Sequence, residues 1–175
     1  MNKRIVISGA PGTGKTSLIK ELSSLGYKCH NEVSRSIISN QLKIKGIVTP
    51  WQDLEAFSDI VIHERLKQYL KASNNIEFYD RSIIDSFAYL LKDNMTIKEE
   101  WNNIAKKHKY FDKVFITPPW KEIYHNDQER KENFTTATKI HSYLIKVYEE
   151  FDYKTIFIPK APIKERINFI LTEIE

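Results

Sequence analysis

The sequence predicts an α/β fold in which a mostly parallel β-sheet carries helices on both faces. Three observations predict this fold. Short apolar runs of strand length alternate with longer segments of helical periodicity, a glycine-rich loop joins the first such strand to the first helix, and no repeat or low-complexity linker divides the chain. The 175 residues, 41% of them apolar and 29% charged, fit one globular domain spanning residues 1–175.

Five strands are expected, four of them clear and one weaker. The clear strands are Arg4 to Ser8, Ile76 to Tyr79, Lys113 to Thr117 and Thr155 to Ile158, and the weaker one is Tyr27 to His30. The clear strands are short and rich in β-branched and aromatic residues, which favour extended backbone.

Helical periodicity follows the first strand. Leu18, Leu22 and Leu25 are spaced by four and three residues, and Gly26 is a typical stop signal. A second helix is expected to begin at Thr49, with Pro50 in its first turn and Gln52 completing a capping box. Its inner side would carry Leu54, Phe57, Val61, Leu66 and Tyr69.

Two more helices are expected toward the end of the chain. One runs from about Phe134 to Glu150, and the other opens at Pro162. The apolar stripe of the latter consists of Ile163, Ile167, Ile170 and Ile174.

The glycine-rich loop is a complete GxxxxGK(S/T) phosphate-binding motif directly after the first strand. Its glycines let successive backbone N–H groups turn inward as an anion-binding nest, at the start of a helix whose positive end faces the same phosphates. We expect Lys15 to reach the β- and γ-phosphates and Thr16 to place its hydroxyl on Mg²⁺. The sequence therefore predicts a P-loop NTPase fold, with nucleotide bound by Gly9, Pro11, Gly12, Thr13, Gly14, Lys15, Thr16 and Ser17.

Asp80 and Arg81 follow the strand that ends at Tyr79. In a parallel sheet, ligands bind outside the carboxyl ends of the strands, so Asp80 would face the Mg²⁺–phosphate site directly or through water. No second acidic residue follows Asp80, which argues against motor-type ATPases, and DxxG and NKxD motifs of GTPase switches are missing. An Asp-Arg pair suits a small kinase, with Arg81 gripping phosphate or substrate. The alternative is a plain helix start, with Ser82 and Asp85 as a capping box.

Glu32 is the best candidate for the base that accepts the proton of an acceptor hydroxyl. It follows the strand Tyr27 to His30, and Arg35 lies one helical turn further on at the same sheet edge. Asp80 stays open as an alternative base. The simpler interpretation is a helix-start glutamate beside a solvated arginine. Phe57 and Trp51 could stack on a planar acceptor, but core packing is the favoured role for them.

A charged segment at 118–133 has the composition of a lid. It follows the strand that ends at Thr117, and it could bring Arg130 onto the triphosphate while excluding water. Lys131 is a weaker candidate for the same role. A charge-rich connection can also be ordinary solvated surface.

Composition excludes several other functions. Cys29 is the single cysteine, so no internal disulfide or cysteine-based zinc site can form, and the five histidines lack a metal-binding spacing such as HExxH. No apolar stretch could span a bilayer, so a cytoplasmic protein without membrane contact is expected. The net charge of +4 and pI near 9.0 favour an anionic ligand, for which a nucleotide suffices. Nucleic acid is possible but not favoured, and the sequence carries no signal for an oligomeric state.

The chain resembles the ATPase/kinase domains related to the nicotinamide riboside kinase domain of NadR. The resemblance rests on blocks in family order over nearly the whole chain: Gly9 to Thr16, Glu32-Val-Ser-Arg35, Tyr79-Asp-Arg-Ser-Ile-Ile-Asp85, Phe115-Ile-Thr-Pro-Pro-Trp120, Asn126-Asp-Gln-Glu-Arg130 and Ile158-Pro-Lys160. It implies a five-stranded parallel sheet, ATP or GTP with Mg²⁺, a lid arginine at Arg130, and a base-binding loop near Lys160 and Ala161.

The family shares its strand-end Asp-Arg-Ser with deoxynucleoside kinases, which implies a nucleoside-like acceptor for Glu32, Arg35 and Asp80. The chain lacks the nucleotidyltransferase half that NadR joins to its kinase, and also a triphosphate-tunnel domain, so the pathway does not carry over.

The leading hypothesis is a Mg²⁺-dependent kinase that moves the γ-phosphoryl group of ATP onto a hydroxyl of a small, nucleoside-like acceptor. One alternative is a regulatory ATPase or binding module in which Asp80 and the lid only sense the triphosphate. Another is a kinase for the 5′-hydroxyl of a polynucleotide, which the basic pI permits but no basic-aromatic stripe supports.

Overall fold

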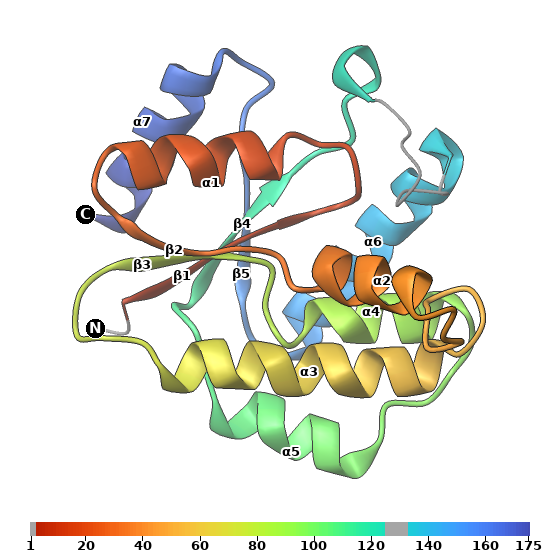
Figure 1. The fold of residues 1–175 in the computed structure, drawn as a ribbon. Helices are drawn as coiled ribbons and strands as arrows, with labels where there is room; N and C mark the ends of the chain where they lie inside the picture. Colours follow the sequence, from red (N-terminus) through yellow and green to blue (C-terminus); the bar gives the residue numbers. More distant parts are fainter. Residues whose placement is uncertain (1–2, 125–132) are drawn as a thin grey trace.

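A single five-stranded parallel sheet runs through the computed structural model, which describes residues 3–124 and 133–175 (Figure 1). The strands are β1 (Arg4–Gly9), β2 (Lys28–His30), β3 (Glu77–Asp80), β4 (Lys113–Thr117) and β5 (Lys154–Phe157). Their spatial order is β2-β3-β1-β4-β5, and every neighbouring pair is parallel. The expected α/β fold is confirmed, including the weaker strand β2.

Two layers of helices cover the sheet, one on each face (Figure 1). On one face, α1 (Lys15–Ser24) packs against α7 (Ile163–Ile174) and closes an apolar cluster with Ile5, Ile7, Phe78 and Phe115. The other face carries α3 (Leu54–Leu70), α4 (Asp85–Lys92), α5 (Glu99–Lys107) and α6 (Phe134–Glu150), packed over Val6, Tyr79, Val114 and Ile116. Two further elements, α2 (Ser34–Lys43) and the 3-10 turn η1 (Lys121–Ile123), follow β2 and β4.

Most helices lie where the sequence predicts them, but two differ. The α3 helix begins at Leu54, because the carboxylate of Asp53 accepts a hydrogen bond from the backbone N–H of Ala56 at 3.0 Å and caps it there. The expected start at Thr49 is therefore wrong, and Thr49 and Gln52 bond to each other in the turn before the helix. The α5 helix was not predicted; its Trp101 is fully buried and donates to Asp59.

The stripe on α1 is shorter than expected. Leu18 and Leu22 are fully buried, whereas Leu25 is 55% exposed at the helix end. Gly26 then adopts a φ of 90°, a conformation that glycine takes without strain, and turns the chain back toward β2.

Successive crossover connections place strands on both sides of β1. The chain passes from β1 through α1 to the β2–β3 side, and later returns to β4 on the other side. Such a switch point leaves a crevice at the carboxyl ends of the central strands, which is where a parallel sheet binds its ligands. No helix in the described residues is long and apolar enough to cross a membrane.

Candidate functional site

The loop between β1 and α1 has the backbone shape of a phosphate nest. Gly12 and Gly14 have φ angles of 77° and 84°, which residues with a side chain rarely adopt. Gly9 approaches β4 so closely that a Cβ atom there would lie 2.1 Å from Thr117 Oγ1. Thr13 holds the loop from inside, since its hydroxyl bonds to the Ala10 carbonyl at 2.8 Å and contacts Thr117 Oγ1 at 2.6 Å.

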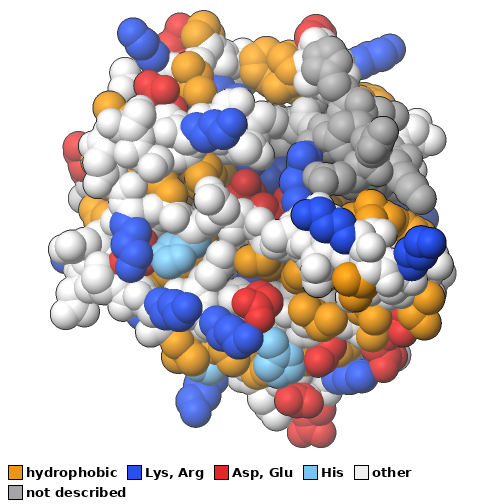
Figure 2. All heavy atoms as spheres, viewed as in Figure 1, with side chains coloured by type: hydrophobic (Ala, Val, Ile, Leu, Met, Phe, Trp, Pro, Cys, Tyr) orange, Lys and Arg blue, Asp and Glu red, His pale blue; other side chains and the backbone are white. Residues whose placement is uncertain are grey.

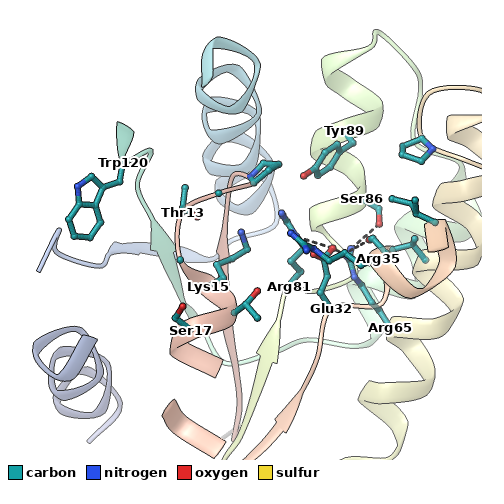
Figure 3. Close-up of a pocket in the computed structure, with 18 of the residues that line it drawn as sticks. Thr13, Lys15, Ser17, Glu32, Arg35, Arg65, Arg81, Ser86, Tyr89 and Trp120 are labelled. Atoms are coloured by element: carbon teal, nitrogen blue, oxygen red, sulfur yellow. Dashed lines mark hydrogen bonds and ion pairs between the residues drawn. The ribbon is translucent and has the colours of Figure 1, made fainter. Parts of the chain in front are cut away.

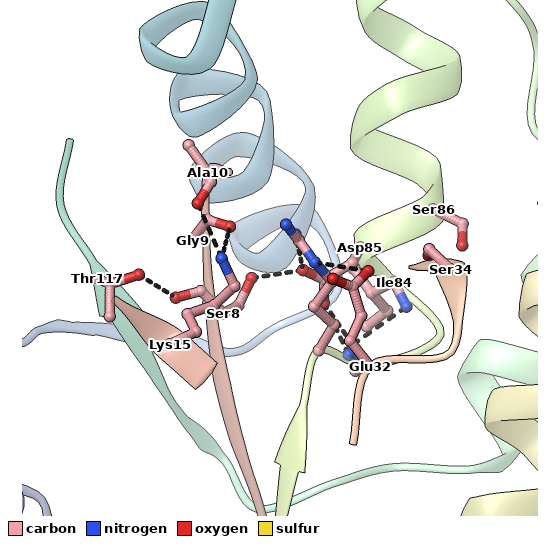
Figure 4. A network of polar contacts seen from close by, with 12 residues as sticks. Ser8, Gly9, Ala10, Lys15, Glu32, Ser34, Ile84, Asp85, Ser86 and Thr117 are labelled. Carbon is pink, nitrogen blue, oxygen red and sulfur yellow. Dashed lines mark hydrogen bonds and ion pairs between the residues drawn. The ribbon is translucent and has the colours of Figure 1, made fainter. Parts of the chain in front are cut away.

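Lys15 lies inside this loop rather than in solvent. Its ammonium donates to the carbonyls of Gly9 and Ala10 at 2.9 and 2.8 Å, and the residue is 6% exposed (Figure 4). Burial, together with the neighbouring Arg81, lowers the pKa of Lys15 to about 7, although Asp80 and Glu32 act to raise it. An anion arriving in the loop would restore the charge of Lys15.

A cavity of about 680 Å³ extends from the P-loop across the ends of the strands. Of the expected nucleotide-binding residues, Pro11 to Ser17 and Ala161 line it; Gly9 forms the strand end beneath it, and Lys160 is exposed outside it. The expected acceptor residues Glu32, Arg35 and Arg81 also line it. Further apolar walls are contributed by Ile38, Leu54, Phe57, Val61, Tyr89, Trp120 and Ile163. Arg130 and Lys131 lie outside the described residues, as does half of the expected lid at 118–133.

The loop divides this cavity into two ends (Figure 3). Trp120, three residues after the end of β4, lies on one side of the loop, while Glu32, Arg65 and Arg81 lie on the other. Trp120 belongs to the end that also contains Ile123, Ala161, Ile163 and Arg166. The surface of the molecule is hollowed in this region, with acidic and basic side chains visible inside it (Figure 2).

Glu32 faces two buried arginines at the second end of the cavity. Its Oε1 atom lies 3.3 Å from Arg81 Nε and 3.8 Å from Arg65 Nη2. Burial acts to raise the pKa of Glu32, but Arg81, Arg65 and Lys15 hold it below its ordinary value. Glu32 is therefore an ionised carboxylate in the cavity wall, with its charge compensated.

Asp80, at the end of β3, has a buried carboxylate oxygen without a hydrogen-bond partner among the described residues. The residue is 5% exposed, and the oxygen without a partner is Oδ1. Burial and the nearby Glu32 raise its pKa to about 6, although Lys15 and Arg81 oppose the shift. A buried oxygen without a donor is a candidate cation ligand, and Thr16, which lines the cavity, supplies a hydroxyl.

Arg81 owes its position to a left-handed backbone and to Asp85. Its φ of 75° is unusual for a residue with a side chain, and its Nη1 atom donates to Asp85 Oδ1 at 3.1 Å. Asp85 is fully buried and also accepts from Ser8 Oγ at 2.5 Å (Figure 4). It accepts further from the Ser82 backbone N–H at 2.8 Å and from the Tyr148 hydroxyl.

Asp85 thus makes more contacts than the predicted helix start requires. The predicted capping box with Ser82 as N-cap does not form: Asp85 accepts from the Ser82 backbone N–H, but Ser82 Oγ accepts from Ile84 N, and Ile84 is the N-cap residue of α4. Burial acts to raise the pKa of Asp85, but Arg81, Arg65 and these hydrogen bonds hold it below its ordinary value. The carboxylate joins the strand that precedes the P-loop to the arginine that faces Glu32.

Two buried arginines of the cavity were missed by sequence reasoning. Arg65 on α3 is 3% exposed and donates to the Ser82 carbonyl and to Ser86 Oγ. Arg166 on α7 is 5% exposed and donates to the Thr13 carbonyl at 3.3 Å. In the sequence, a charged residue in a helix indicates a solvated face, and only the packing of distant elements reveals that these two are enclosed.

A sequence-family model described as an AAA domain matches residues 4–166 of the chain. No curated protein matches it in sequence.

Solved structures match the fold over nearly the whole chain. Deoxyadenosine kinase from M. mycoides with the products dCMP and dCDP bound is 16% identical, with a TM-score of 0.68. The alignment covers 98% of this chain and 97% of that one. Thymidylate kinase from Candida albicans is 18% identical, with a TM-score of 0.68 and coverage of 99% and 91%. NadR protein in complex with NR is 16% identical, with a TM-score of 0.67. The alignment covers 99% of this chain and 50% of NadR. At such identities these likenesses establish the P-loop fold and its five-stranded parallel sheet.

Proposed function

The chain belongs to the AAA domain family, and we propose that it is a kinase that transfers the γ-phosphoryl group of ATP to a hydroxyl of a nucleoside-like acceptor. The observation that carries the proposal is the continuity of the cavity. The P-loop lies between the two ends of the cavity, and one of these ends is an apolar chamber with the compensated carboxylate of Glu32 and the guanidinium of Arg81 in its wall. Transfer requires both substrates in one enclosed space, which a site built only for sensing a nucleotide does not need.

In this proposal the P-loop and Lys15 hold the triphosphate of the donor, ATP or GTP. Mg²⁺ would be held by the hydroxyl of Thr16 and the carboxylate of Asp80, whose buried Oδ1 lacks a donor among the described residues. The ion, when bound, neutralises charge on the phosphates. Asp80, which was also expected to bind the acceptor, does not line the cavity, unlike Glu32, Arg35 and Arg81.

Glu32 is assigned as the base that accepts the proton of the acceptor hydroxyl. It lines the cavity and is ionised, and Arg81 beside it would contact the migrating phosphoryl group. Arg35 contributes to the same wall as a substrate contact. The size and apolar character of the chamber, with Phe57 and Tyr89 in its walls, favour a planar ring attached to a sugar.

The similar folds support an acceptor of this class. The printed names of the matched structures are deoxyadenosine kinase, thymidylate kinase and NadR with NR, all proteins that act on or bind nucleosides or nucleotides. Arg130 stays a prediction as the cation that a lid would bring to the triphosphate.

The proposal is tested by incubating the protein with Mg·ATP and a panel of nucleosides, nicotinamide riboside and 5′-hydroxyl oligonucleotides, and by measuring transfer of labelled phosphate. Transfer to a nucleoside-like compound is expected. Transfer to oligonucleotides alone would make the protein a polynucleotide kinase, and tight ATP binding without any transfer would favour the regulatory module. Either outcome would overturn the proposal.

The assignment of the base is tested with Glu32→Gln, which keeps the size of the side chain but removes its charge. We expect ATP affinity to stay unchanged and turnover to fall at least about tenfold. Lys15→Ala should abolish transfer. Glu64→Gln, at a partly exposed position on α3 outside the cavity, is the matched control and should leave both quantities unchanged. Full turnover in Glu32→Gln would move the base to Asp80.

A further inference from the structure

The acceptor end of the cavity, which is the end with Glu32, contains more positive than negative side chains. The other end contains Ala161 of the expected base-binding loop and is assigned to the donor. Among the described residues that line the cavity, Glu32 is the only carboxylate. Three arginines line the acceptor end with it, namely Arg35, Arg65 and Arg81 (Figure 3). An acceptor bound there meets several guanidinium groups and one carboxylate.

Glu32 is already engaged with two of these arginines. Its Oε1 atom lies 3.3 Å from Arg81 Nε and 3.8 Å from Arg65 Nη2. Asp85 also contacts Arg81, but it is fully buried and does not line the cavity. A positive charge on the acceptor would therefore compete with two guanidinium groups for one carboxylate. Repulsion between like charges a few ångströms apart is strong where water is excluded.

The aromatic side chains of the acceptor end are poor partners for a cation. A cation binds favourably over the face of an aromatic ring. Tyr89 lines the cavity, but the guanidinium carbon of Arg81 already lies 5.7 Å from the centre of its ring. Phe57 is 7% exposed, so little of its ring faces the cavity. Ile38 and Leu54 add aliphatic wall, which favours an uncharged ring.

The proposed transfer makes the acceptor end more positive. The proton of the acceptor hydroxyl moves to Glu32 while the hydroxyl oxygen bonds to the γ-phosphorus, and the bond from that phosphorus to the β-phosphate oxygen breaks to release ADP. Glu32 is then neutral, whereas Arg65 and Arg81 keep their charges. A positive charge on the acceptor ring is therefore opposed more strongly during transfer than on binding, and lowers kcat more than it raises KM.

We propose that the acceptor is a nucleoside with an uncharged ring, and that the acceptor end rejects cationic pyridinium nucleosides. The inference rests on the proposed function, because it concerns the acceptor of that transfer. Nicotinamide riboside, whose ring is a pyridinium cation, is thus expected to be a poor acceptor, although the chain shares its fold with NadR.

The test compares acceptors that match in shape but differ in charge. Nicotinamide riboside is a cation, whereas its reduced dihydro form is neutral; a second pair is 1-methyladenosine, a cation at pH 7, and neutral 1-methylinosine. Transfer of labelled phosphate from Mg·ATP gives kcat/KM for each compound. We expect the neutral member of a pair to exceed the cation by at least about tenfold. If only unmodified nucleosides accept phosphate, the four compounds are compared as competitive inhibitors, and the neutral members should bind at least about threefold more tightly.

Two variants test whether the arginines cause this preference. Arg65→Met and Arg35→Met each remove one charge and keep an apolar stem, so either should reduce the ratio between neutral and cationic acceptors at least about threefold. Because a ratio is measured, a general loss of activity does not change the conclusion. Lys67→Met, at an exposed position on α3 outside the cavity, is the matched control and should leave the ratio unchanged.

Two results would overturn the inference and leave the kinase proposal intact. One is equal or faster transfer to the cations, or equal or tighter binding of them, in the natural protein. The other is an unchanged ratio in the folded arginine variants, because the preference would then come from shape. Failure of every nucleoside-like compound to accept phosphate would overturn the proposed function, and the inference with it.

Discussion

Asp80 is a single residue of the binding site whose burial lowers the stability of the folded protein. Its pKa rises from 3.8 to about 6, so between these values the folded protein holds a proton that the unfolded chain has lost. The free energy of unfolding therefore falls as the pH rises from about 4 to about 6. Above pH 6 the carboxylate is ionised in the folded protein as well, and the loss of stability is complete. A cation at Oδ1 would remove this cost.

Asp80→Asn should consequently stabilise the unliganded protein at neutral pH. We expect the melting temperature at pH 7.5 to rise by about 5 °C, and the gain to disappear below about pH 4, where the natural carboxyl is protonated in both states. Phosphoryl transfer should be lost. Thermal unfolding followed by circular dichroism across this pH range measures the effect; a variant less stable than the natural protein at pH 7.5 would contradict the argument.

Asp85 is the second residue whose removal has a defined consequence. Because it fixes Arg81 and the Ser8 hydroxyl together, Asp85→Asn should lower kcat/KM by about tenfold or more through displacement of Arg81. The double variant with Arg81→Ala should be no worse than Arg81→Ala alone, since both changes remove the same guanidinium. Additive losses would show that the two residues act independently.

Tyr148→Phe provides a milder version of the same experiment. It removes one hydroxyl from the Asp85 network on the side away from the cavity, and leaves Asp85 with its bonds from Ser8, Ser82 and Arg81. The expected result is a lower melting temperature with kcat/KM reduced less than threefold. Comparison of Tyr148→Phe with Asp85→Asn therefore distinguishes the contribution of this network to stability from its contribution to the position of Arg81.

At the scale of elements, the contact between β1 and β4 shapes the P-loop. Gly9 is the last residue of β1 and lies beside Thr117, the last residue of β4. With a φ of 142°, and with Thr117 Oγ1 and its carbonyl 2.1 and 2.6 Å from any added Cβ, the position excludes every side chain. The two strand ends are in contact through backbone and cannot separate without distorting the loop.

Gly9→Ala should therefore destabilise the protein by more than 3 kcal/mol or prevent folding. Gly26→Ala is the matched control, because Gly26 also has a positive φ but nothing lies within 4 Å of an added Cβ. It should cost only about 1 kcal/mol, from backbone strain alone. Urea unfolding measures both; similar values for the two variants would show that strain, and not the contact with Thr117, dominates at Gly9.

The whole molecule should respond to its nucleotide through mass action. If Mg·ATP binds the folded protein alone, a concentration a hundred times the dissociation constant adds about 2.7 kcal/mol, which raises the melting temperature by roughly 5 to 10 °C. Chelating the metal with EDTA should remove most of this shift, and Thr16→Ala should reduce it. An equal shift with and without Mg²⁺ would contradict the assignment of Thr16 and Asp80 as metal ligands.

The fold was largely predictable from the sequence because its signals are local. Apolar runs mark β1 and β4, and the glycine spacing fixes the loop between β1 and α1. Where two local signals competed, the prediction failed: Thr49 and Asp53 both suit a helix N-cap, and the structure uses Asp53. The α5 helix was missed because its polar sequence buries mainly one residue, Trp101.

The site was predictable only in part. Glu32, Arg35 and Arg81 line the cavity as expected, since sheet topology brings strand ends together. Arg65 and Arg166 were not foreseen, because nothing near them in the sequence distinguishes a buried arginine from a solvated one. Their enclosure depends on the packing of α3 and α7 against distant elements, which one sequence does not encode as a local pattern.

The two ends of the cavity come from separate stretches of the chain. Apart from the P-loop, the end with Glu32 is built by residues between 32 and 89, and the end with Trp120 by residues between 120 and 166. An engineer could therefore exchange the walls of one end for those of a protein with another acceptor, while keeping the donor end and its strands. The division also gives evolution two independent surfaces to vary, so acceptor preference can diversify among relatives that use the same phosphate donor.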